Sequence, residues 1–564
     1  MIVFDIETHK WDKIYAIGYT ADGVRADFIA SEDKPNSYFI KWLLDNVGED
    51  IIYSHNGGKF DMLFVFDYCV AHNIEILKLK IIHSSLAMLK IKYGDKKLEF
   101  RDSYLILPSS LKKLTTSFNV VHKKLELDYE IGLKDKRFRD YFTNDILGLY
   151  EVLIDAQKMG LTEKLTIAGA SMNEYLSNYS DIKPNALQSN IRSRLENYYY
   201  GGRTEVFKRY GEELFYYDIN SLYPYVMYKY EYPQINSSYK FVTDSSLIND
   251  CDFIYCDVTA PEINIPFIPL KLNGKLLFTL GRFNTFITKN EYDFAKKLGY
   301  RFEFIYGLKA SSTARIFSEF VKTNYEIKKK SMGAKREIAK LFLNSLYGKF
   351  GQKHVQTKYV LKNIRELKKK SAITDTDLVF IIGNKYIKPI KAVTHSDYER
   401  IDIAMQITAN ARIELYKLMQ RANMDVYYCD TDSIFTSKEL KVSDALGDIK
   451  LESEVKEFVA LAPKFYGYKT YDNKTIIHAK GFKSSDITYK KLKDMLNSSV
   501  AIKSDYSHLN YFKDYIRKQK LYNYKITKQV KAEYDKRILL KDGVDTLPLT
   551  IYPQPLQLTS PQPL

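Results

Sequence analysis

Cysteine is scarce in this sequence, with 4 residues among 564, and no two of them form a CxxC pair. Without paired cysteines or a matching His/Cys cluster, we expect neither a disulfide framework nor a zinc site, which fits a reducing compartment. Long apolar runs are missing too, and Asp5 and Glu7 interrupt the N-terminal run where a signal peptide would need it. We therefore expect a cytoplasmic protein that has no membrane partner.

Negative charge is in the minority. The sequence carries 69 Asp and Glu against 85 Lys and Arg, a net charge of +16, with a pI of about 9.1. Such an excess suits a polyanionic partner, although composition does not separate nucleic acid from a membrane surface. The length of 564 residues, with 45% apolar and 27% charged residues, predicts a globular protein of several domains.

The strongest local pattern is VYYCDTDSIF at residues 426–435. β-Branched and aromatic residues favour strands and the Asp-Thr-Asp-Ser cluster favours a turn, so the pattern predicts two strands with two carboxylates between them. In an extended backbone, side chains at i and i+2 share a face, so Asp430 and Asp432 are expected close together. One then takes up a proton, or a cation bridges the pair. The alternative is a polar hairpin turn without further function.

A second apolar strand, within LFYYDINSLYPYVM at residues 214–227, ends in Asp218 and a turn closed by Pro224. Two distant strands that each end in Asp can supply a two-metal site for in-line phosphoryl transfer. The strings DINSLYP and YCDTDS resemble the first and third polymerase motifs of family B DNA polymerases. The catalytic carboxylates that this resemblance implies are Asp218, Asp430 and Asp432.

The same resemblance implies further contacts around Asp218. The metal ligands are Asp218, Asp432 and Ile219. The nucleotide contacts in the turn are Ser221, Leu222 and Tyr223. The ring of Tyr223 is expected to pack under the incoming deoxyribose and to collide with a 2′-OH.

A helix is predicted at residues 334–348, AKREIAKLFLNSLYG. Arg336, Lys340, Asn344 and Tyr347 are spaced by four, four and three residues, so they lie on one helical face. Two cations, an amide and an aromatic ring suit a nucleotide, and a solvated amphipathic face is the alternative. The string KLFLNSLYGKFG resembles the second family B motif, which implies nucleotide binding by these four residues and a catalytic role for Lys340.

A second set of acids lies in the N-terminal third. Asp5 and Glu7 share one face of a strand-like opening, Asp61 follows a Gly-Gly turn, and Tyr141 and Asp145 lie one turn apart in a predicted helix. All-oxygen ligands suit Mg²⁺ or Mn²⁺ rather than zinc. Two such ions can activate a water and stabilise the leaving 3′ oxygen of a phosphodiester. Taken singly, each acid is more often a solvated surface charge.

As a set, these residues resemble the three motifs of DEDDy 3′–5′ exonucleases. The resemblance implies that the metal ligands are Asp5, Glu7, Asp61 and Asp145, and that Tyr141 assists catalysis. The contacts that it implies with the single-stranded 3′ end are Thr8, Asn56 and Phe60. Further primer contacts are Ser110, Leu111 and Lys124.

Three shorter strings resemble other family B motifs. YYGG at residues 199–202 resembles the YxGG motif that couples synthesis to editing, AMQITANAR at residues 404–412 resembles the TxxAR segment, and KTY at residues 469–471 resembles the KxY motif at the primer end. Taken alone, the first is a turn after a helix and the last an exposed strand. The DNA contacts that these strings imply are Tyr199, Gly201, Gly202, Thr408, Arg412, Lys469 and Tyr471.

The motifs run along nearly the whole chain in the family's order. The resemblance implies an α/β multidomain fold, with a ribonuclease H-like exonuclease domain followed by a palm–fingers–thumb polymerase with two insertions. The expected boundaries are 1–180 for the exonuclease, 181–229 and 401–500 for the palm, 316–351 for the fingers, 501–564 for the thumb and tail, and 230–315 and 352–400 for the insertions. The stretch from Gly543 is Pro-rich and low in charge, so we expect a loosely ordered tail.

The two insertions make the protein-primed polymerases of phages and linear replicons the most similar subgroup, because they lie where that subgroup has its terminal-protein regions. The run Lys368-Lys369-Lys370 would suit an acidic partner face. The subgroup implies replication of a phage, viral or linear plasmid genome, in the host cytoplasm if viral, with two Mg²⁺ or Mn²⁺ ions in each active site. The implied partners of this monomer are a DNA template-primer, dNTPs and a terminal protein.

Three other interpretations stay open. The first is an RNA- or DNA-primed family B polymerase, which a priming assay would separate. The second is a non-catalytic DNA-binding relative, but Asp218, Asp432 and Lys340 are all present. The third is a nuclease alone, which leaves the C-terminal motifs unexplained.

Overall fold

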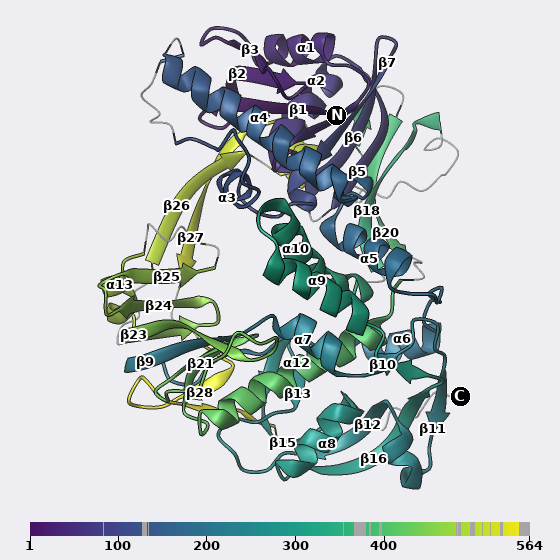
Figure 1. The fold of residues 1–564 in the computed structure, drawn as a ribbon, viewed down its shortest axis with the longest axis vertical. Helices are drawn as coiled ribbons and strands as arrows, with labels where there is room; N and C mark the ends of the chain where they lie inside the picture. The colour runs from purple at the N-terminus through teal and green to yellow at the C-terminus, as the bar shows by residue number, and fades with distance from the viewer. Residues whose placement is uncertain are drawn as a thin grey trace.

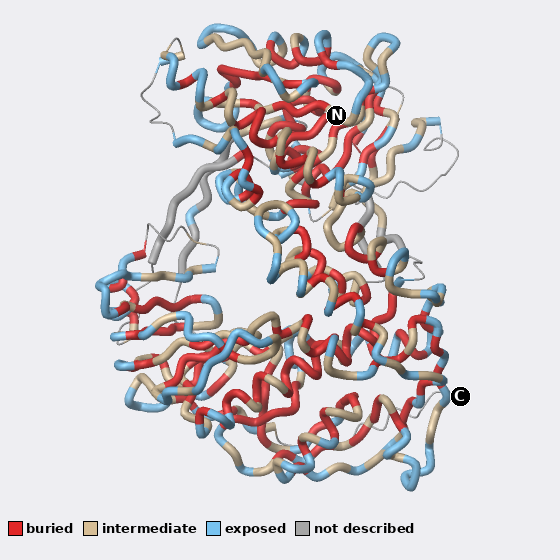
Figure 2. The backbone as a smooth tube through the Cα atoms, in the orientation of Figure 1, coloured by how far each residue is buried: buried red, intermediate tan, exposed pale blue. Residues whose placement is uncertain are grey.

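The computed structural model describes residues 1–82, 84–126, 132–133, 135–352, 355–365, 380–382, 385–393, 398–480, 482, 487–496, 502–509, 511–518, 520–530 and 534–551. These residues form several separate sheets covered by helices, as expected for an α/β multidomain protein (Figure 1). Figure 2 shows buried residues gathered inside an upper, N-terminal half and a lower half. Among the described helices, none is long and apolar enough to cross a membrane.

The N-terminal sheet has the strand order β3-β2-β1-β4-β7-β6-β5. Its strands are β1 (Ile2–His9), β2 (Lys13–Thr20), β3 (Asp27–Ala30), β4 (Ile51–Ser54), β5 (Glu75–Ile82), β6 (Ser85–Tyr93) and β7 (Lys96–Asp102). Its helices are α1 (Asn36–Asn46), α2 (Asp61–Ala71), α3 (Leu111–Ser117) and α4 (Lys136–Lys158). The parallel strands β1, β4 and β7 lie at the centre, and β1 begins with three consecutive buried residues. Such continuous apolar runs are typical of strands that are covered on both faces.

The central sheet has the strand order β25-β24-β23-β9-β22-β21-β8 and combines segments from distant parts of the chain. Its strands are β8 (Thr204–Val206), β9 (Tyr210–Ile219), β21 (Val426–Asp430), β22 (Ser433–Thr436), β23 (Ile449–Ala462), β24 (Phe465–Thr470) and β25 (Thr475–Ala479). The helices of this half and those that join it to the N-terminal sheet are α5 (Ile167–Asn178), α6 (Ser189–Glu196), α7 (Leu222–Lys229), α9 (Ser318–Lys330), α10 (Gly333–Phe350), α12 (Ile401–Arg421) and α13 (Tyr489–Asp494). Helix α12 is buried along most of its length, and buried polar side chains such as Asn410 and Arg412 find hydrogen-bond partners inside the protein.

The first predicted insertion, residues 230–315, is mostly strands, with one α-helix and one short 3-10 helix among its described elements. Its elements are β10 (Tyr232–Pro233), β11 (Tyr239–Val242), β12 (Phe253–Thr259), β13 (Pro269–Leu272), β14 (Lys275–Phe278), β15 (Leu280–Thr288), α8 (Lys289–Lys297), β16 (Arg301–Ala310) and β17 (Thr313–Ala314). Thr288 and Glu291 form a capping box that starts α8 directly after β15.

The second predicted insertion and a C-terminal hairpin both pack against the N-terminal half (Figure 1). Their elements are β18 (Val355–Asn363), β19 (Phe380–Ile382), β20 (Lys385–Val393), β26 (Ile502–Leu509), α14 (Phe512–Lys518) and β27 (Asn523–Val530). Phe512 lies 5.0 Å from Phe66 between ring centroids, and Lys385 pairs with Glu75 at 3.1 Å. The predicted basic run Lys368-Lys369-Lys370 lies outside the described residues.

The prediction of a loosely ordered tail from Gly543 is wrong for residues 543–551, and residues 552–564 lie outside the described part. The end of the described chain forms β28 (Arg537–Leu539), β29 (Thr546–Pro548) and β30 (Thr550–Ile551). β30 pairs in parallel with β15, and it approaches so closely that a Cβ at Gly281 would lie 1.9 Å from the carbonyl oxygen of Ile551. The prediction failed because composition alone does not distinguish a loose tail from a short, uncharged strand that pairs with the edge of another sheet.

Candidate active sites

Asp218 and Asp432 meet on neighbouring strands of the central sheet. Asp218 pairs in register with Ser433 of β22, and the N–H of Ile219 donates to the carbonyl oxygen of Asp432 at 2.8 Å. Burial, and then the neighbouring Asp218, raise the pKa of Asp432 to about 7. Burial also raises the pKa of Asp218, against the effect of Lys450, whose Nζ lies 3.5 Å from Asp218 Oδ1. Two half-buried carboxylates this close suit a bound cation.

The hairpin that carries Asp430 and Asp432 forms as predicted, but the extended geometry expected for the two acids is wrong. β21 ends at Asp430 and Thr431 has φ 61°, so the chain turns between them. Asp430 instead accepts hydrogen bonds from Lys464 Nζ at 3.0 Å on both oxygens and from Thr204 Oγ1 at 3.0 Å. Lys464 therefore compensates the charge of Asp430, and Asp432 faces Asp218.

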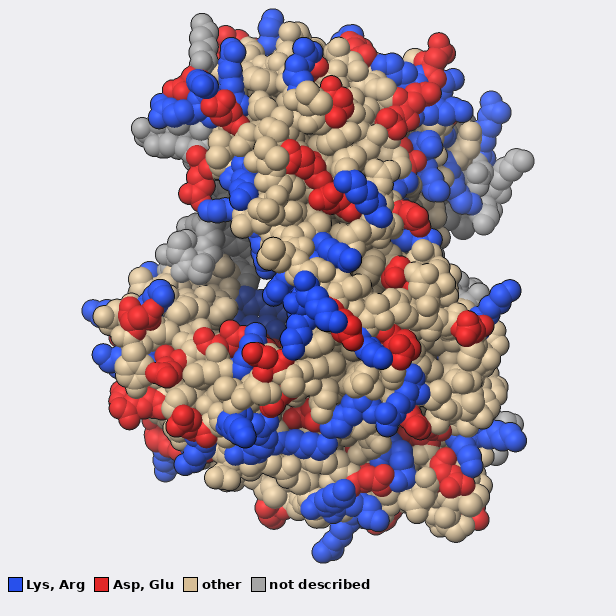
Figure 3. All heavy atoms as spheres, in the orientation of Figure 1, with Lys and Arg blue, Asp and Glu red and all other residues tan. Residues whose placement is uncertain are grey.

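Positive side chains of α9 and α10 lie near the Asp218 site: the charge of Lys328 acts on Asp218, and Lys340 and Arg336 lie near Lys328. Lys328 Nζ donates to Ser221 Oγ at 2.9 Å. Burial, followed by the nearby charges of Lys340 and Arg336, lowers the pKa of Lys328. Figure 3 shows Lys and Arg side chains gathered beside the hollow between the two halves. Lys328 is a site residue that the sequence patterns did not indicate: it lies in a run of three lysines at the end of α9, and such a run is usually solvated.

Helix α10 confirms the predicted helix, and the four predicted residues share its open side. The opposite side is buried through Ile338, Ala339, Phe342, Leu343, Leu346 and Phe350. Arg336 and Asn344 are exposed, whereas Lys340 and Tyr347 are half-buried. The ring of Tyr347 stacks on that of Tyr223, with centroids 4.1 Å apart and planes 14° apart. The start of α7, where Leu222 is buried, thus lies against the predicted nucleotide face.

The predicted Gly-Gly loop lies directly against the hairpin turn. The N–H of Thr431 donates to the carbonyl oxygen of Arg203 at 2.7 Å. A Cβ at Gly202 would lie 2.8 Å from Thr431 Cγ2, so this position tolerates no side chain. Gly201 is exposed and Tyr199 is half-buried. The loop therefore places an open backbone beside the Asp432 turn.

Thr408 and Arg412 are buried on α12, at 1% and 3% exposure, which leaves no surface for the direct DNA contact predicted for them. Arg412 instead donates to the carbonyl oxygens of Tyr200 and Gly201 at 2.9 Å each. Its other nitrogen pairs with Glu291 at 2.8 Å. Arg412 therefore holds the Gly-Gly loop in position from the buried helix α12.

Lys469 and Tyr471 lie at the end of β24. Lys469 pairs with Glu457 at 3.3 Å and lies 4.5 Å from the ring centroid of Tyr489. Tyr471 is 54% exposed. Their contact with a primer stays a prediction.

Three of the four predicted nuclease acids form one cluster between the central strand β1 and helix α4. Oxygens of Asp5, Glu7 and Asp145 lie within 4.8 Å of one another, so the predicted shared face of Asp5 and Glu7 is confirmed. Burial raises the pKa of Glu7 to about 7, and burial with the neighbouring acids raises that of Asp5. Asp145 Oδ1 is buried without a hydrogen-bond partner among the described residues. An all-oxygen set with an unpartnered buried oxygen fits a divalent cation.

Asp61 lies beside this cluster but outside the group of three. Its Oδ1 accepts the N–H of Ile6 at 3.1 Å, and burial raises its pKa to about 8. Lys124 takes a place within the cluster, because its Nζ donates to Asp145 Oδ2 and lies 3.4 Å from the hydroxyl of Tyr141. Tyr141 in turn hydrogen-bonds to Glu7. Lys124, predicted only as a primer contact, therefore also holds an acid of the cluster.

Two of the predicted single-strand contacts, Thr8 and Phe60, adjoin acids of this region in the sequence. Asn56 is exposed with φ 60°, half-buried Thr8 follows Glu7 on β1, and Phe60 directly precedes Asp61. Ser110, exposed, caps α3 by accepting the N–H of Lys113 at 3.4 Å, and Leu111 begins that helix. DNA binding by these residues stays a prediction.

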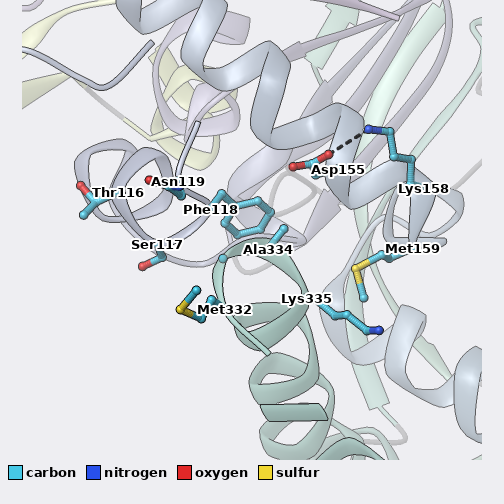
Figure 4. Close-up of a pocket in the computed structure, with 11 residues that line it drawn as sticks. Thr116, Ser117, Phe118, Asn119, Asp155, Lys158, Met159, Met332, Ala334 and Lys335 are labelled. Atoms are coloured by element: carbon cyan, nitrogen blue, oxygen red, sulfur yellow. Dashed lines mark hydrogen bonds and ion pairs between the residues drawn. The ribbon is translucent and has the colours of Figure 1, made fainter. Parts of the chain in front are cut away.

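A pocket of about 700 Å³ lies where the start of α10 meets the ends of α3 and α4 (Figure 4). Gly333 approaches Phe118 closely, since a Cβ there would lie 3.3 Å from its carbonyl oxygen. The side chains that line the pocket include Thr116, Ser117, Phe118, Asp155, Met332 and Lys335. None of the predicted site residues lines this pocket.

The sequence matches the family described as DNA polymerase type B, organellar and viral, over residues 47–138 and 133–424. Among curated proteins, the probable DNA polymerase of Podospora anserina is 26% identical over 97% of this chain and 58% of its own length. The DNA-directed DNA polymerase of Enterobacteria phage PRD1 is 27% identical over 85% of this chain and 84% of its own. The chain spans about half the length of three of the fungal relatives that it matches, at 58%, 54% and 43%.

Among solved structures, phi29 DNA polymerase complexed with primer-template DNA and incoming nucleotide substrates has a TM-score of 0.72 at 21% identity. That match covers 94% of this chain and 100% of the other. The agreement confirms the predicted α/β multidomain polymerase fold. Since the two family matches together span more than half of the sequence, the chain belongs to the organellar and viral type B DNA polymerases.

Proposed function

We propose that the chain is a template-directed DNA polymerase with a 3′–5′ exonuclease, which replicates a phage, viral or linear plasmid genome. The observation that carries the proposal is the meeting of Asp218 and Asp432 opposite the cations of α9 and α10. The net charge of +16 suits a DNA partner. Relatives named DNA polymerase, and a structural neighbour complexed with primer-template DNA, support it.

For synthesis, Asp218 and Asp432 would hold two Mg²⁺ ions with Ile219 as a further ligand, and these ions, when bound, help to activate the primer 3′-OH and neutralise developing phosphate charge. Arg336 and Lys340 bring fixed positive charge to the triphosphate from α10, which lowers the cost of charge build-up on the leaving pyrophosphate. Lys464 holds Asp430, and with it the hairpin turn, at a fixed position.

For editing, Asp5, Glu7 and Asp145 would hold the ions, with Asp61 alongside, and these ions, when bound, supply an activated water and stabilise the leaving 3′ oxygen. Tyr141 is placed to orient that water, because its hydroxyl lies within the cluster beside Glu7. The two sets of acids are carried by different elements, β1, α2 and α4 for editing and the end of β9 with the β21–β22 turn for synthesis, so the two reactions use different residues.

Tyr223 is proposed to exclude ribonucleotides. Its ring is held by stacking on Tyr347 at 4.1 Å, so it does not move aside easily for a 2′-OH. We expect Tyr223→Val to raise the ratio of ribonucleotide to deoxyribonucleotide insertion about 10-fold or more, whereas Tyr223→Phe, which keeps the ring, retains discrimination. Single-nucleotide insertion kinetics measure both. An unchanged ratio in the valine variant would make Tyr223 a packing residue of the turn.

We also propose that synthesis starts on a protein. The two insertions add surface beside the sites, and a protein primer needs such docking surface while its Ser, Thr or Tyr hydroxyl attacks the α-phosphorus and pyrophosphate leaves. We expect the product of a neighbouring gene, incubated with the enzyme, Mg²⁺ and a labelled dNTP, to acquire a covalently bound nucleotide.

A variant lacking residues 352–400 should fail to form this adduct but still extend a DNA primer. That control matters because the insertion also packs against the N-terminal half through Lys385 and Glu75. If the full chain starts only from nucleic-acid primers, the RNA- or DNA-primed alternative holds, and the assignments of both acid clusters are unaffected.

A further inference from the structure

An aromatic pair at the tip of the β1–β2 hairpin includes a residue that has no role in the function proposed above. Trp11 lies between the two strands, and its ring stands edge-on to that of Phe60, with centroids 6.0 Å apart and planes 89° apart. The indole is 47% exposed. Phe60 is supported from another side by Phe64, at 5.6 Å. The pair is therefore anchored at Phe60 and open at Trp11.

The backbone holds Trp11 in an unusual conformation. Lys10 has φ 49° and Trp11 has φ 72°, a region that bulky side chains rarely adopt. The hairpin register also shifts between Glu7 and Thr8, and such a bulge re-aims the residues that follow it. A glycine would close this turn without strain, so the strained tryptophan indicates a functional constraint on the tip.

Both rings belong to residues that are close in sequence to the acids of the carboxylate cluster or to Asp61 beside it. Trp11 follows Glu7 within one hairpin turn, and Phe60 directly precedes Asp61, which accepts the N–H of Ile6 at 3.1 Å. Exposed Lys59 stands next to Phe60, with its Nζ 5.9 Å from the ring centroid of Tyr104. Aromatic faces beside a cation are the components of a single-strand binding site.

We propose that Trp11 and Phe60 form a stacking platform for the terminal base of an unpaired DNA 3′ end that enters the cluster of Asp5, Glu7 and Asp145. The proposal rests on the exonuclease function proposed above. Stacking accepts any base, because every base has a π-face, and an editing site must accept all four.

The sequence supplies a direct optical test, because Trp11 and Trp42 are its two tryptophans. Trp42 packs on Tyr19 at 5.6 Å. We expect the full-length Trp42→Phe variant, in which Trp11 is the only tryptophan, to show saturable fluorescence quenching by a short oligothymidylate, in EDTA or with Ca²⁺. The matched Trp11→Phe variant, in which only Trp42 fluoresces, should not respond. Absence of quenching in the first variant under both conditions overturns the proposal.

Degradation kinetics provide a second test of stacking on Trp11. We expect Trp11→Ala to raise KM for degradation of single-stranded DNA about 10-fold, with kcat at saturation retained, since base–aromatic stacking has that order of effect. Trp11→Tyr should recover most of the loss. With a substrate whose 3′-terminal nucleotide is abasic, the wild type and Trp11→Ala should have the same KM, because no base is left to stack. Extension of a paired primer should not change.

The outcomes separate this inference from the exonuclease assignment. If the wild type degrades no DNA, the nuclease assignment fails, and the quenching experiment alone decides whether the platform exists. If the wild type degrades DNA and Trp11→Ala has an unchanged KM, the platform is wrong. A loss of kcat that tyrosine does not restore would instead give Trp11 a structural role in the hairpin and would also overturn it.

Discussion

Replacing Asp218 by Ala is expected to lower nucleotide incorporation about 10³-fold or more while single-strand degradation continues. The substitution removes one of the two carboxylates that meet between β9 and β22, and Lys450, 3.5 Å from Asp218, keeps only Glu452 as its partner among the described residues. Asp432→Ala should have the same effect, because the two acids form one unit. Primer extension and oligonucleotide degradation, measured on the same preparation, test both parts.

Asp425→Ala is the matched control for this experiment. Asp425 lies just before β21 and pairs with Lys208 at 2.9 Å, at the opposite end of that strand from Asp430. Its loss removes an acid of the same sheet without touching the Asp218 pair, so incorporation should persist. Normal synthesis by Asp218→Ala or Asp432→Ala would show that the reactive centre lies elsewhere.

The double variant Asp5→Ala, Glu7→Ala should lose 3′–5′ degradation, again by about 10³-fold or more, and should accumulate misincorporated nucleotides. Both carboxylates belong to the cluster within 4.8 Å, so without them only Asp145 of that group remains, already paired with Lys124. The polymerase rate should be retained, because the central sheet is untouched. Degradation of a labelled single strand and a mismatch-extension assay measure the two effects.

Glu99→Ala controls for damage to the N-terminal sheet. Glu99 lies on β7, where it pairs with Lys90 at 3.2 Å and with Arg101 at 2.6 Å, apart from the cluster. This variant should degrade DNA normally. An intact exonuclease in the Asp5, Glu7 double variant would remove the basis of the editing assignment and of its metal ligands.

Where the sequence predicted the geometry correctly, the interaction was local. The open face of α10 follows from helical spacing alone, and the shared face of Asp5 and Glu7 from the alternation of a strand. The same rule failed for Asp430 and Asp432, because Thr431 adopts φ 61° and ends the extended backbone between them. Local periodicity holds only as far as the regular element extends.

The parts that the sequence did not predict depend on long-range contacts. Lys464 reaches Asp430 across 34 residues from a turn with φ 61°, and nothing around it marks it as a partner. The segment from Gly543 resembled a loose tail, yet the carbonyl oxygen of Leu549 accepts the N–H of Leu280 at 2.8 Å, and β30 pairs with β15. Arg412 belongs to a string that resembles a family motif, but the sequence did not show that it is buried. Its burial, which makes it a positioning residue, comes from the packing of α12.

The central claim is that synthesis on the Asp218–Asp432 pair follows a template. In the most direct test, the full chain is supplied with Mg²⁺, a defined primer-template and one dNTP at a time. The reaction is then repeated with each of the other template bases. We predict that the primer gains only the nucleotide complementary to the template base, and that the preferred nucleotide changes whenever that base changes. Addition that ignores the template, or no addition by a folded chain that still degrades single strands, would contradict the account.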